Sequence, residues 1–150
     1  MAKVSPFLWF AGSMQEAVNF YVSVFKDARV HEMGTMSARF ELMGREFLAL
    51  NAHAHQPFTE AISFFIEVDS QEEVDYYWRA FLDGGGQEQM CGWLKDKFGV
   101  SWQVIPKALG RYLSDRDRPK AERVMQAMMK MKKIVIADLD RAYAEQGGSR

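Results

Sequence analysis

The feature of this sequence that most constrains its fold is an internal repeat at an offset of 56 residues. Two predicted helices, near residues 13–25 and 69–81, each follow a short apolar strand and begin with a Ser or Asp cap. The matching positions are Gln15 with Gln71, Glu16 with Glu72, Val18 with Val74, Tyr21 with Tyr77, and Phe25 with Phe81. We interpret this match as two copies of one supersecondary unit rather than two unrelated amphipathic helices.

Short strands complete each repeat. One strand precedes each helix and short strands follow it, bounded by glycines and turn residues. The predicted strands cover 4–10, 29–36, 38–43 and 46–52 in the first repeat, and 62–68, 87–95 and 99–105 in the second. The pattern predicts an α+β fold in one domain spanning 1–150, with repeat one at about 4–54 and repeat two at about 60–106. A helical tail, 107–146, follows Pro106.

Composition excludes several classes of function. The 150 residues include 19 basic and 20 acidic side chains, so the net charge of −1 favours neither nucleic acid nor a membrane surface as partner. Lys130, Lys132 and Lys133 are interpreted as a solvated helix end, with nucleic-acid binding as the alternative. No apolar run approaches the length of a membrane span or a signal peptide, so we expect a cytoplasmic protein.

The tail is rich in methionine. Val124, Met125, Met128 and Met129 share one face of a predicted helix, and we interpret this face as core or as a dimer contact. A promiscuous binding groove is the alternative, because methionine side chains adapt to varied ligands.

Three stretches carry a resemblance to a known family: residues 6–10 (PFLWF), 16–21 (EAVNFY) and 91–103 (CGWLKDKFGVSWQ). They resemble the PhnB-like branch, with its 3-demethylubiquinone-9 3-methyltransferase domain, of the glyoxalase/bleomycin-resistance/dioxygenase (vicinal oxygen chelate) superfamily. The resemblance covers roughly residues 4–142. It implies two βαβββ modules that form a curled mixed sheet around a pocket, and a homodimer.

The methyltransferase name of this branch finds no support in the residues. A common methyltransferase needs a Gly-rich turn after the first strand of a doubly wound parallel sheet. The Gly-rich run of this chain, Gly84–Gly86, follows a helix instead.

The resemblance also implies where a metal would bind, on the first and last strand of each half. The matching residues are Pro6, Ala49, Ser63 and Gln103. None is an imidazole, carboxylate or thiolate, the ligands that divalent transition metals prefer, so we predict no metal cofactor. His53 and His55 are weak metal candidates, since alternate strand residues face the same way. The alternative is two exposed loop histidines.

Cys91 is the only cysteine, so neither an intramolecular disulfide nor a cysteine-based zinc site is expected. As a nucleophile, Cys91 would need a nearby base or positive charge to lower the pKa of its thiol. A buried structural thiol is the favoured interpretation. Asp96, the first residue of the four-residue turn that ends at Gly99, is interpreted as a turn residue rather than a catalytic one.

Gln103 is the most informative polar residue. If Trp102 packs beneath the helices, the alternation of a strand turns the Gln103 carboxamide toward the pocket. It then holds either a ligand or a neighbouring side chain such as Ser63. Further residues are expected to line the pocket, namely Asn51, Ala49, Phe65 and Trp93.

An apolar pocket with a few neutral polar groups suits a neutral or aromatic small molecule better than a phosphate. The sequence therefore predicts a small-molecule-binding protein that lacks the usual metal site. A metal-dependent isomerase, lyase or transferase of the same superfamily is the alternative, and whether the chain is an enzyme stays open.

Overall fold

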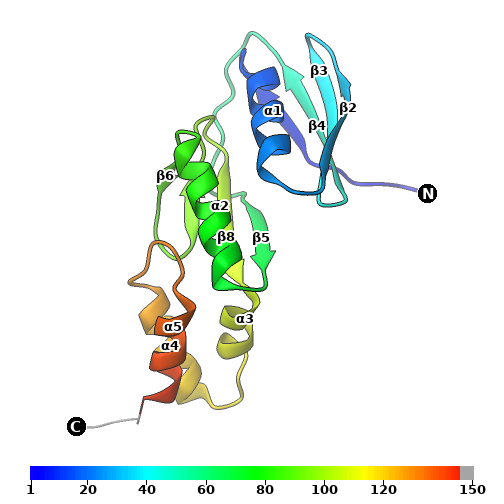
Figure 1. Ribbon diagram of the computed structural model, residues 1–150. Helices are drawn as coiled ribbons and strands as arrows, with labels where there is room; N and C mark the ends of the chain where they lie inside the picture. Colours follow the sequence, from blue (N-terminus) through cyan, green and yellow to red (C-terminus); the bar gives the residue numbers. More distant parts are fainter. Residues whose placement is uncertain (146–150) are drawn as a thin grey trace. The chain divides into compact units, whose positions relative to one another are not determined.

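The structure, a computed structural model, describes residues 1–145 and falls into two compact units, residues 1–58 and the chain from residue 59 onward (Figure 1). The first unit contains one helix and four strands: β1 (Phe7–Phe10), α1 (Met14–Val24), β2 (Ala28–Met33), β3 (Ser37–Leu42) and β4 (Arg45–Asn51). Its strands form one sheet in the order β1-β4-β3-β2, with β1 parallel to β4 and the remaining pairs antiparallel.

The second unit repeats this arrangement. It contains β5 (Phe64–Val68), α2 (Gln71–Asp83), β6 (Gln87–Glu88), β7 (Trp93–Lys95) and β8 (Ser101–Pro106). The sheet order is β5-β8-β7-β6, and again the first strand pairs in parallel with the last. The predicted α+β class with two modules is confirmed, because both sheets have the same order and the same mixture of strand directions.

Each helix covers one face of its own sheet through stacked aromatic rings. In the first unit Tyr21 of α1 stacks on Phe40, and Phe40 stacks on Phe47 with ring centroids 5.3 Å apart. In the second unit Phe81 of α2 lies 5.0 Å from Trp102, ring centroid to ring centroid. Burying an aromatic side chain of this size contributes roughly 1.5–3 kcal/mol to stability. The apolar spacing of the two helices is therefore explained by the core of each module.

The two helices begin differently. Ser70 caps α2 by accepting from the Glu73 amide at 3.2 Å, and the Glu73 carboxylate accepts from the Asp69 amide at 2.8 Å. This pair resembles a capping box, except that Glu73 accepts from the residue before the cap instead of from Ser70 itself. Ser13 occupies the equivalent place before α1 but makes no side-chain capping hydrogen bond. The sequence predicted a Ser or Asp cap before each helix; the side-chain cap forms in the second module, at Ser70, one residue later than the repeat offset places it.

The predicted strand over 87–95 is wrong, because the structure has two strands there, β6 and β7. Between them the backbone of Cys91 (φ 62°) and Gly92 (φ 83°) lies in the left-handed region. Left-handed backbone cannot continue a strand, and for Cys91, which has a Cβ, it is uncommon. The turn lets β6 pair antiparallel with β7, with Gln87 opposite Lys95.

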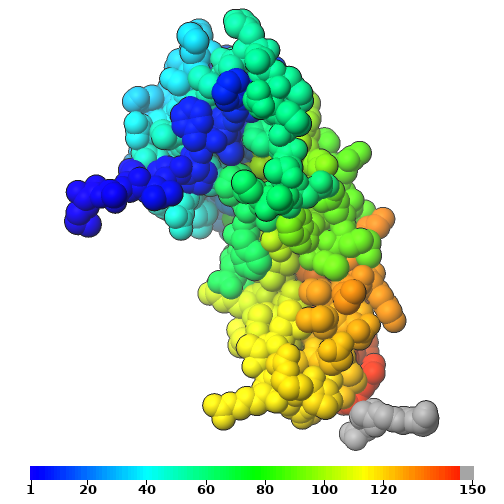
Figure 2. Space-filling view, turned by 180° about the vertical axis from the view of Figure 1, so that it is seen from behind, coloured from blue at the N-terminus to red at the C-terminus, as the bar shows by residue number. Residues whose placement is uncertain are grey.

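Three helices follow β8: α3 (Lys107–Leu113), α4 (Arg118–Met128) and α5 (Ile136–Ala144). Together, residues 107–145 are called the C-terminal extension. Their shared core is the cluster of Ile105, Leu109, Val124, Ile134 and Leu139. The helices lie beyond the end of β8, and from behind their yellow and orange atoms pack against the second module (Figures 1 and 2). Residue 146, the last of the predicted tail, lies outside the described residues.

None of the helices in the described part of the chain is long and apolar enough to cross a membrane.

Candidate functional site

The two faces of the second sheet have different roles. Trp102 and Val104 of β8 are buried on the side that α2 covers, so the residue between them, Gln103, projects from the opposite side. We call that opposite side the open face. Strand register places Phe65 of β5 and Trp93 of β7 directly opposite Gln103, one on each side. An aromatic side chain therefore flanks the Gln103 carboxamide in both directions.

The Gln103 carboxamide makes a hydrogen bond within the protein through its nitrogen. Its Nε2 donates to the Ser63 hydroxyl at 2.9 Å, from the residue just before β5. Among the residues that the structure describes, no partner binds the Gln103 amide oxygen. Gln103 is half-buried, whereas Phe65 is 55% exposed. Four of the predicted pocket residues, Gln103, Ser63, Phe65 and Trp93, thus lie together on one face.

A second polar group lies next to Gln103 on the open face and was missed in the sequence. Ser101 is 1% exposed, and its Oγ has no hydrogen-bond partner among the described residues. A buried hydroxyl without a partner is uncommon in native proteins and often marks a water or ligand position. The strand alternation that places Gln103 on the open face also places Ser101 there, so the sequence pattern could have identified Ser101.

Charge lies at one edge of this face. Lys95 stands opposite Ser101 in the register, and its Nζ is 3.2 Å from the Glu60 carboxylate. The pKa of Glu60 is lowered, first by the hydrogen bond from Lys95 and then by the one from Gln89. Glu60 neutralises Lys95, so the polar groups beside Gln103 are neutral, and the exposed carboxylate of this face, Glu67, lies farther along β5, opposite Ile105.

Ala49 does not lie where the sequence analysis expected. It is 1% exposed and shares a face of β4 with Phe47, whose ring stacks on Phe40 beneath α1. Leu48 and Leu50 are the residues of β4 that project from the other side. A strand has a period of two, so an error of one residue moves a side chain to the opposite face. The expectation that Ala49 lines the pocket is corrected accordingly.

Asn51 serves the backbone of its own unit. Its Oδ1 accepts from the Gly12 amide at 2.7 Å, and its Nδ2 donates to the Thr35 carbonyl at 3.3 Å. The carboxamide thus joins the loop before α1 to the loop before β3. One lone pair and one N–H remain for a ligand, fewer than the sequence alone suggested.

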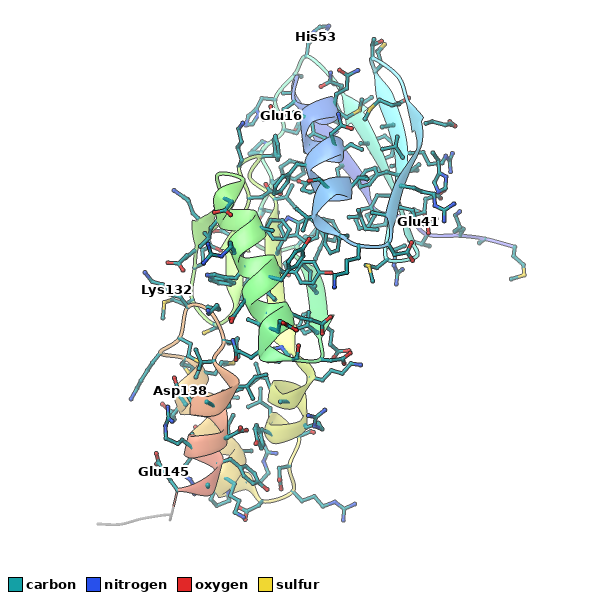
Figure 3. The ribbon with its side chains drawn as sticks, viewed as in Figure 1. Glu16, Glu41, His53, Lys132, Asp138 and Glu145 are labelled. Atoms are coloured by element: carbon teal, nitrogen blue, oxygen red, sulfur yellow. The ribbon has the colours of Figure 1, made fainter. Side chains whose placement is uncertain are left out.

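His53 and His55 are exposed in the segment that follows β4, and His53 points outward from it (Figure 3). His53 borders a hollow of about 370 Å³. Its other lining residues are Ala11, Gly12, Thr35, Met36, Asn51 and Ala52. No lining residue apart from His53 is a strong metal ligand. In residues 1–145 no group of three or more His, Cys, Asp or Glu side chains is placed to hold a metal ion.

Cys91 and Asp96 have structural roles. Cys91 lies in the turn between β6 and β7, and its amide donates to the Met131 carbonyl at 2.7 Å. Asp96 is buried: its Oδ1 accepts from the amides of Phe98 and Val100, and its Oδ2 accepts from the Trp102 indole at 2.9 Å. The interpretation of Asp96 as a turn residue is confirmed.

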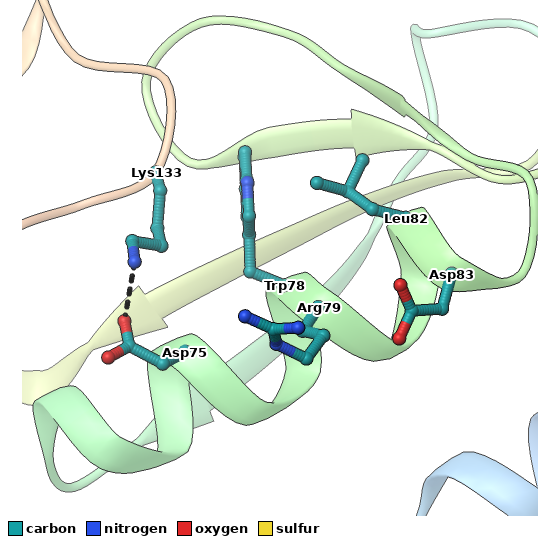
Figure 4. Close-up of a pocket in the computed structure, with 6 residues that line it drawn as sticks. All are labelled: Asp75, Trp78, Arg79, Leu82, Asp83 and Lys133. Atoms are coloured by element: carbon teal, nitrogen blue, oxygen red, sulfur yellow. Dashed lines mark ion pairs between the residues drawn. The ribbon is translucent and has the colours of Figure 1, made fainter.

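A second hollow, of about 350 Å³, lies along α2 (Figure 4). Asp75 and Lys133 form an ion pair of 2.8 Å across it, and Trp78, Arg79, Leu82 and Asp83 complete its lining. The pKa of Asp75 is lowered, first by the hydrogen bond from Lys133 and then by the one from Gln71. Cation and anion here satisfy each other, so the hollow offers less to a ligand than the open face does.

Comparison with known proteins supplies the family. The sequence profile of the 3-demethylubiquinone-9 3-methyltransferase family matches residues 2–105. This chain belongs to that family. A PhnB protein of the family from Bacillus cereus is 29% identical, with a TM-score of 0.65, and 70% of this chain covers 99% of it. A search of curated proteins finds no match.

More distant structures share the fold. Protein PA1353 from Pseudomonas aeruginosa is 23% identical, with a TM-score of 0.59, and 71% of this chain covers 98% of it. The fosfomycin resistance protein FosX from Listeria monocytogenes, complexed with Mn(II) and sulfate, is 15% identical with a TM-score of 0.57. There 75% of this chain covers 98% of the other. These likenesses show that the fold is shared.

The metal site that the superfamily resemblance implied does not fit the residues of this chain. On the side of each sheet away from its helix, the residues around the expected ligand positions are aromatic, aliphatic, hydroxyl and carboxamide groups. They are Phe7 and Trp9, Leu48 and Leu50, Ser63 and Phe65, and Ser101 and Gln103. Two carboxylates share these faces, Glu46 of β4 and Glu67 of β5, but Glu46 is paired with Lys3 and Arg39. A divalent transition metal prefers several imidazole, carboxylate or thiolate ligands together, and in residues 1–145 no group of three is so placed. Correcting the position of Ala49 leaves this conclusion unchanged, because its neighbours are leucines.

Proposed function

We propose that this chain binds a small neutral molecule on the open face of the second sheet, without a divalent metal. The observation that carries the proposal is the Gln103 carboxamide, placed between Phe65 and Trp93 with its oxygen available. Apolar walls with a few oriented polar groups are typical of small-molecule sites. The side chains around Gln103, namely Ser63, Phe65, Trp93 and Ser101, are poor metal ligands, which supports binding by hydrogen bonds and apolar contact.

The chemistry of the face suggests the class of ligand. The Gln103 oxygen accepts a hydrogen bond, and the Ser101 hydroxyl can donate or accept one. Lys95 is already paired with Glu60, so an anionic group gains little there. A flat molecule with an aromatic or apolar body and a hydroxyl, such as a phenol, matches these features better than a phosphate ester does.

Calorimetric titration with 4-propylphenol and with its phosphate ester tests this proposal. We expect the phenol to bind more tightly, and Gln103→Leu to weaken phenol binding about tenfold, the value of one hydrogen bond of roughly 1.4 kcal/mol. Gln126→Leu is the matched control, because Gln126 is exposed on α4 and its carboxamide contacts only Glu122 in the described structure. Equal affinities of wild type and Gln103→Leu would contradict the proposal.

Elemental analysis of protein purified without chelator separates this function from its alternative. A stoichiometric divalent metal would favour the metal-dependent isomerase, lyase or transferase instead. The homodimer and the cytoplasmic location implied earlier stay predictions, and light scattering on the purified protein checks the first.

A further inference from the structure

The C-terminal extension lies outside the region that this chain shares with its relatives. The family profile ends at residue 105, and 70% of this chain already covers 99% of the Bacillus cereus protein. The extension begins two residues later, at Lys107. Whatever the extension does is therefore a property that this chain adds to the shared module.

The extension reaches the open face next to Gln103. Ile105 follows Gln103 by two residues on β8, so both project from the same side of the sheet. Ile105 is only 7% exposed because Leu109, Val124, Ile134 and Leu139 of the extension cluster with it. Along β8, the open face therefore ends at a wall of aliphatic side chains.

Gly92 shows how closely this wall is packed. A Cβ placed on Gly92 would lie 2.7 Å from the Ile105 Cδ1 and 3.1 Å from the Ile134 Cγ1. Trp93, the aromatic neighbour of Gln103, is the next residue along the chain. The turn that carries Trp93 is thus packed directly against Ile134.

Backbone hydrogen bonds fasten the extension on both sides of Ile134. The amides of Cys91 and Gly92 donate to the carbonyls of Met131 and Lys132 at 2.7 and 2.8 Å. On the other side, the Gln71 carboxamide donates to the Ile134 carbonyl at 3.0 Å and accepts from the Ile136 amide at 2.7 Å. These contacts hold Ile134 against both α2 and the β6–β7 turn.

Charge also favours this docking. Residues 107–145 carry ten basic and six acidic side chains, whereas residues 59–106 carry three basic and nine acidic. Two ion pairs of 2.8 Å join the oppositely charged parts: Lys107 with Asp69, and Lys133 with Asp75, the second of which Figure 4 shows. The extension is held by apolar contacts, backbone hydrogen bonds and charge together.

We propose that the extension is the end wall of the small-molecule site and that Ile134 limits the length of ligand the site accepts. The inference rests on the proposed function, since a wall has meaning only beside a ligand. A molecule bound at Gln103 and extending toward the end of β8 meets Ile105 and Ile134. In the opposite direction, toward Ser63, the extension contributes no barrier.

The test of the wall uses phenols of increasing para-alkyl length as probes, from phenol to 4-heptylphenol. Ile134→Ala should raise the affinity ratio of long to short probes about tenfold, since one or two methylenes are worth that much in an apolar pocket. Val74→Ala is the control: Val74 is buried on α2, on the side of the second sheet away from the open face, so its truncation should leave the ratio unchanged. If Ile134→Ala leaves the affinity ratio of long to short phenols unchanged, the proposal that Ile134 limits ligand length is wrong.

A second readout needs no ligand. The rate at which a chromogenic disulfide reagent modifies the half-buried Cys91 reports whether the extension is docked on the β6–β7 turn. Gln71→Leu should raise this rate severalfold. Gln15→Leu, the repeat-equivalent change in the first module, should not, because Gln15 bonds to the Gly34 carbonyl of its own unit. Equal modification rates of Cys91 in Gln71→Leu and wild type would contradict the proposal that Gln71 holds the extension on the second module.

The two readouts separate the failure of the wall from the failure of the site. If wild type binds the phenols and Ile134→Ala leaves their ratio unchanged, the wall is wrong and the proposed function stands. If wild type binds none of the phenols, the proposed function is wrong, and so is the proposal that Ile134 limits ligand length. The modification rates of Cys91 still decide whether Gln71 holds the extension in place.

Discussion

Gln103 and Ser63 join the last strand of the second module to the start of its first strand through a hydrogen bond of 2.9 Å. The bond fixes the orientation of the Gln103 carboxamide, because the nitrogen is held by Ser63 and the oxygen is turned away from it. An amide held in this way is ready to accept a hydrogen bond without reorganising. This preorganisation is the basis of the proposed site.

Ser101→Ala tests whether the buried hydroxyl is without a partner. A buried unsatisfied hydroxyl costs about 1–3 kcal/mol, so its removal should raise the free energy of unfolding of the ligand-free protein by up to about 1 kcal/mol. Ser70→Ala should have the opposite effect, a loss of about 1 kcal/mol, because Ser70 caps α2. Urea unfolding of both variants measures the sign of each change in the free energy of unfolding. A destabilised Ser101→Ala variant would show that the Ser101 hydroxyl has a hydrogen-bond partner.

Asp96→Ala should be among the most destabilising single changes in the second module. It leaves the amides of Phe98 and Val100 and the buried Trp102 indole without their acceptor, at an expected cost of about 2–4 kcal/mol. Asp83→Ala, at an exposed position at the end of α2, should cost less than about 0.5 kcal/mol. Denaturant midpoints measure both, and equal midpoints would contradict the role given to Asp96.

Two glycines should respond to alanine with opposite signs. Gly92→Ala requires a left-handed backbone and brings a Cβ to 2.7 Å from Ile105, so we expect a loss of about 2 kcal/mol or more. Gly110 lies inside α3, and a Cβ there meets no atom within 4 Å. Gly110→Ala should stabilise the protein by about 0.5–1 kcal/mol, because alanine is the better helix former. Thermal unfolding compares the two variants.

Acid should destabilise the first unit through Glu46. Hydrogen bonds from Lys3 and then Arg39 lower the pKa of this carboxyl from 4.5 to about 2. A lowered carboxyl pKa stabilises the folded state above the unfolded pKa, and this stabilisation is lost as the pH falls from 4.5 toward 2. In Glu46→Gln the stability curve should lose this part of its slope. A carboxyl NMR titration of Glu46 with a midpoint near 4.5 would contradict the prediction.

Much of the module could be predicted because its signals are local. The aromatic spacing around Tyr21 and Phe81 follows from helical periodicity, and the repeat at an offset of 56 residues needs no tertiary information. Alternation along β8 likewise predicts that Gln103 projects away from Trp102. Each of these inferences depends on residues a few positions apart, where backbone geometry alone relates the side chains.

Other features depend on exact position and on distant partners. Ala49 was assigned to the wrong face because an uncertainty of one residue decides which way a strand residue points. The turn at Cys91 was missed because a cysteine rarely adopts a left-handed backbone. Asn51 was read as a pocket residue, and only the fold shows its carboxamide between Gly12 and Thr35.

The sequence by itself determined the two-module α+β fold and the residue types at the four expected metal positions, because periodicity and residue chemistry can be read without coordinates. Only the tertiary structure decided that Phe65 and Trp93 flank Gln103, since strand register brings together residues separated by up to 38 positions. It also decided where the extension docks. Gln71 and Ile134 are 63 residues apart, and no local pattern relates them. Their contact arises from the packing of the extension on the end of the second sheet.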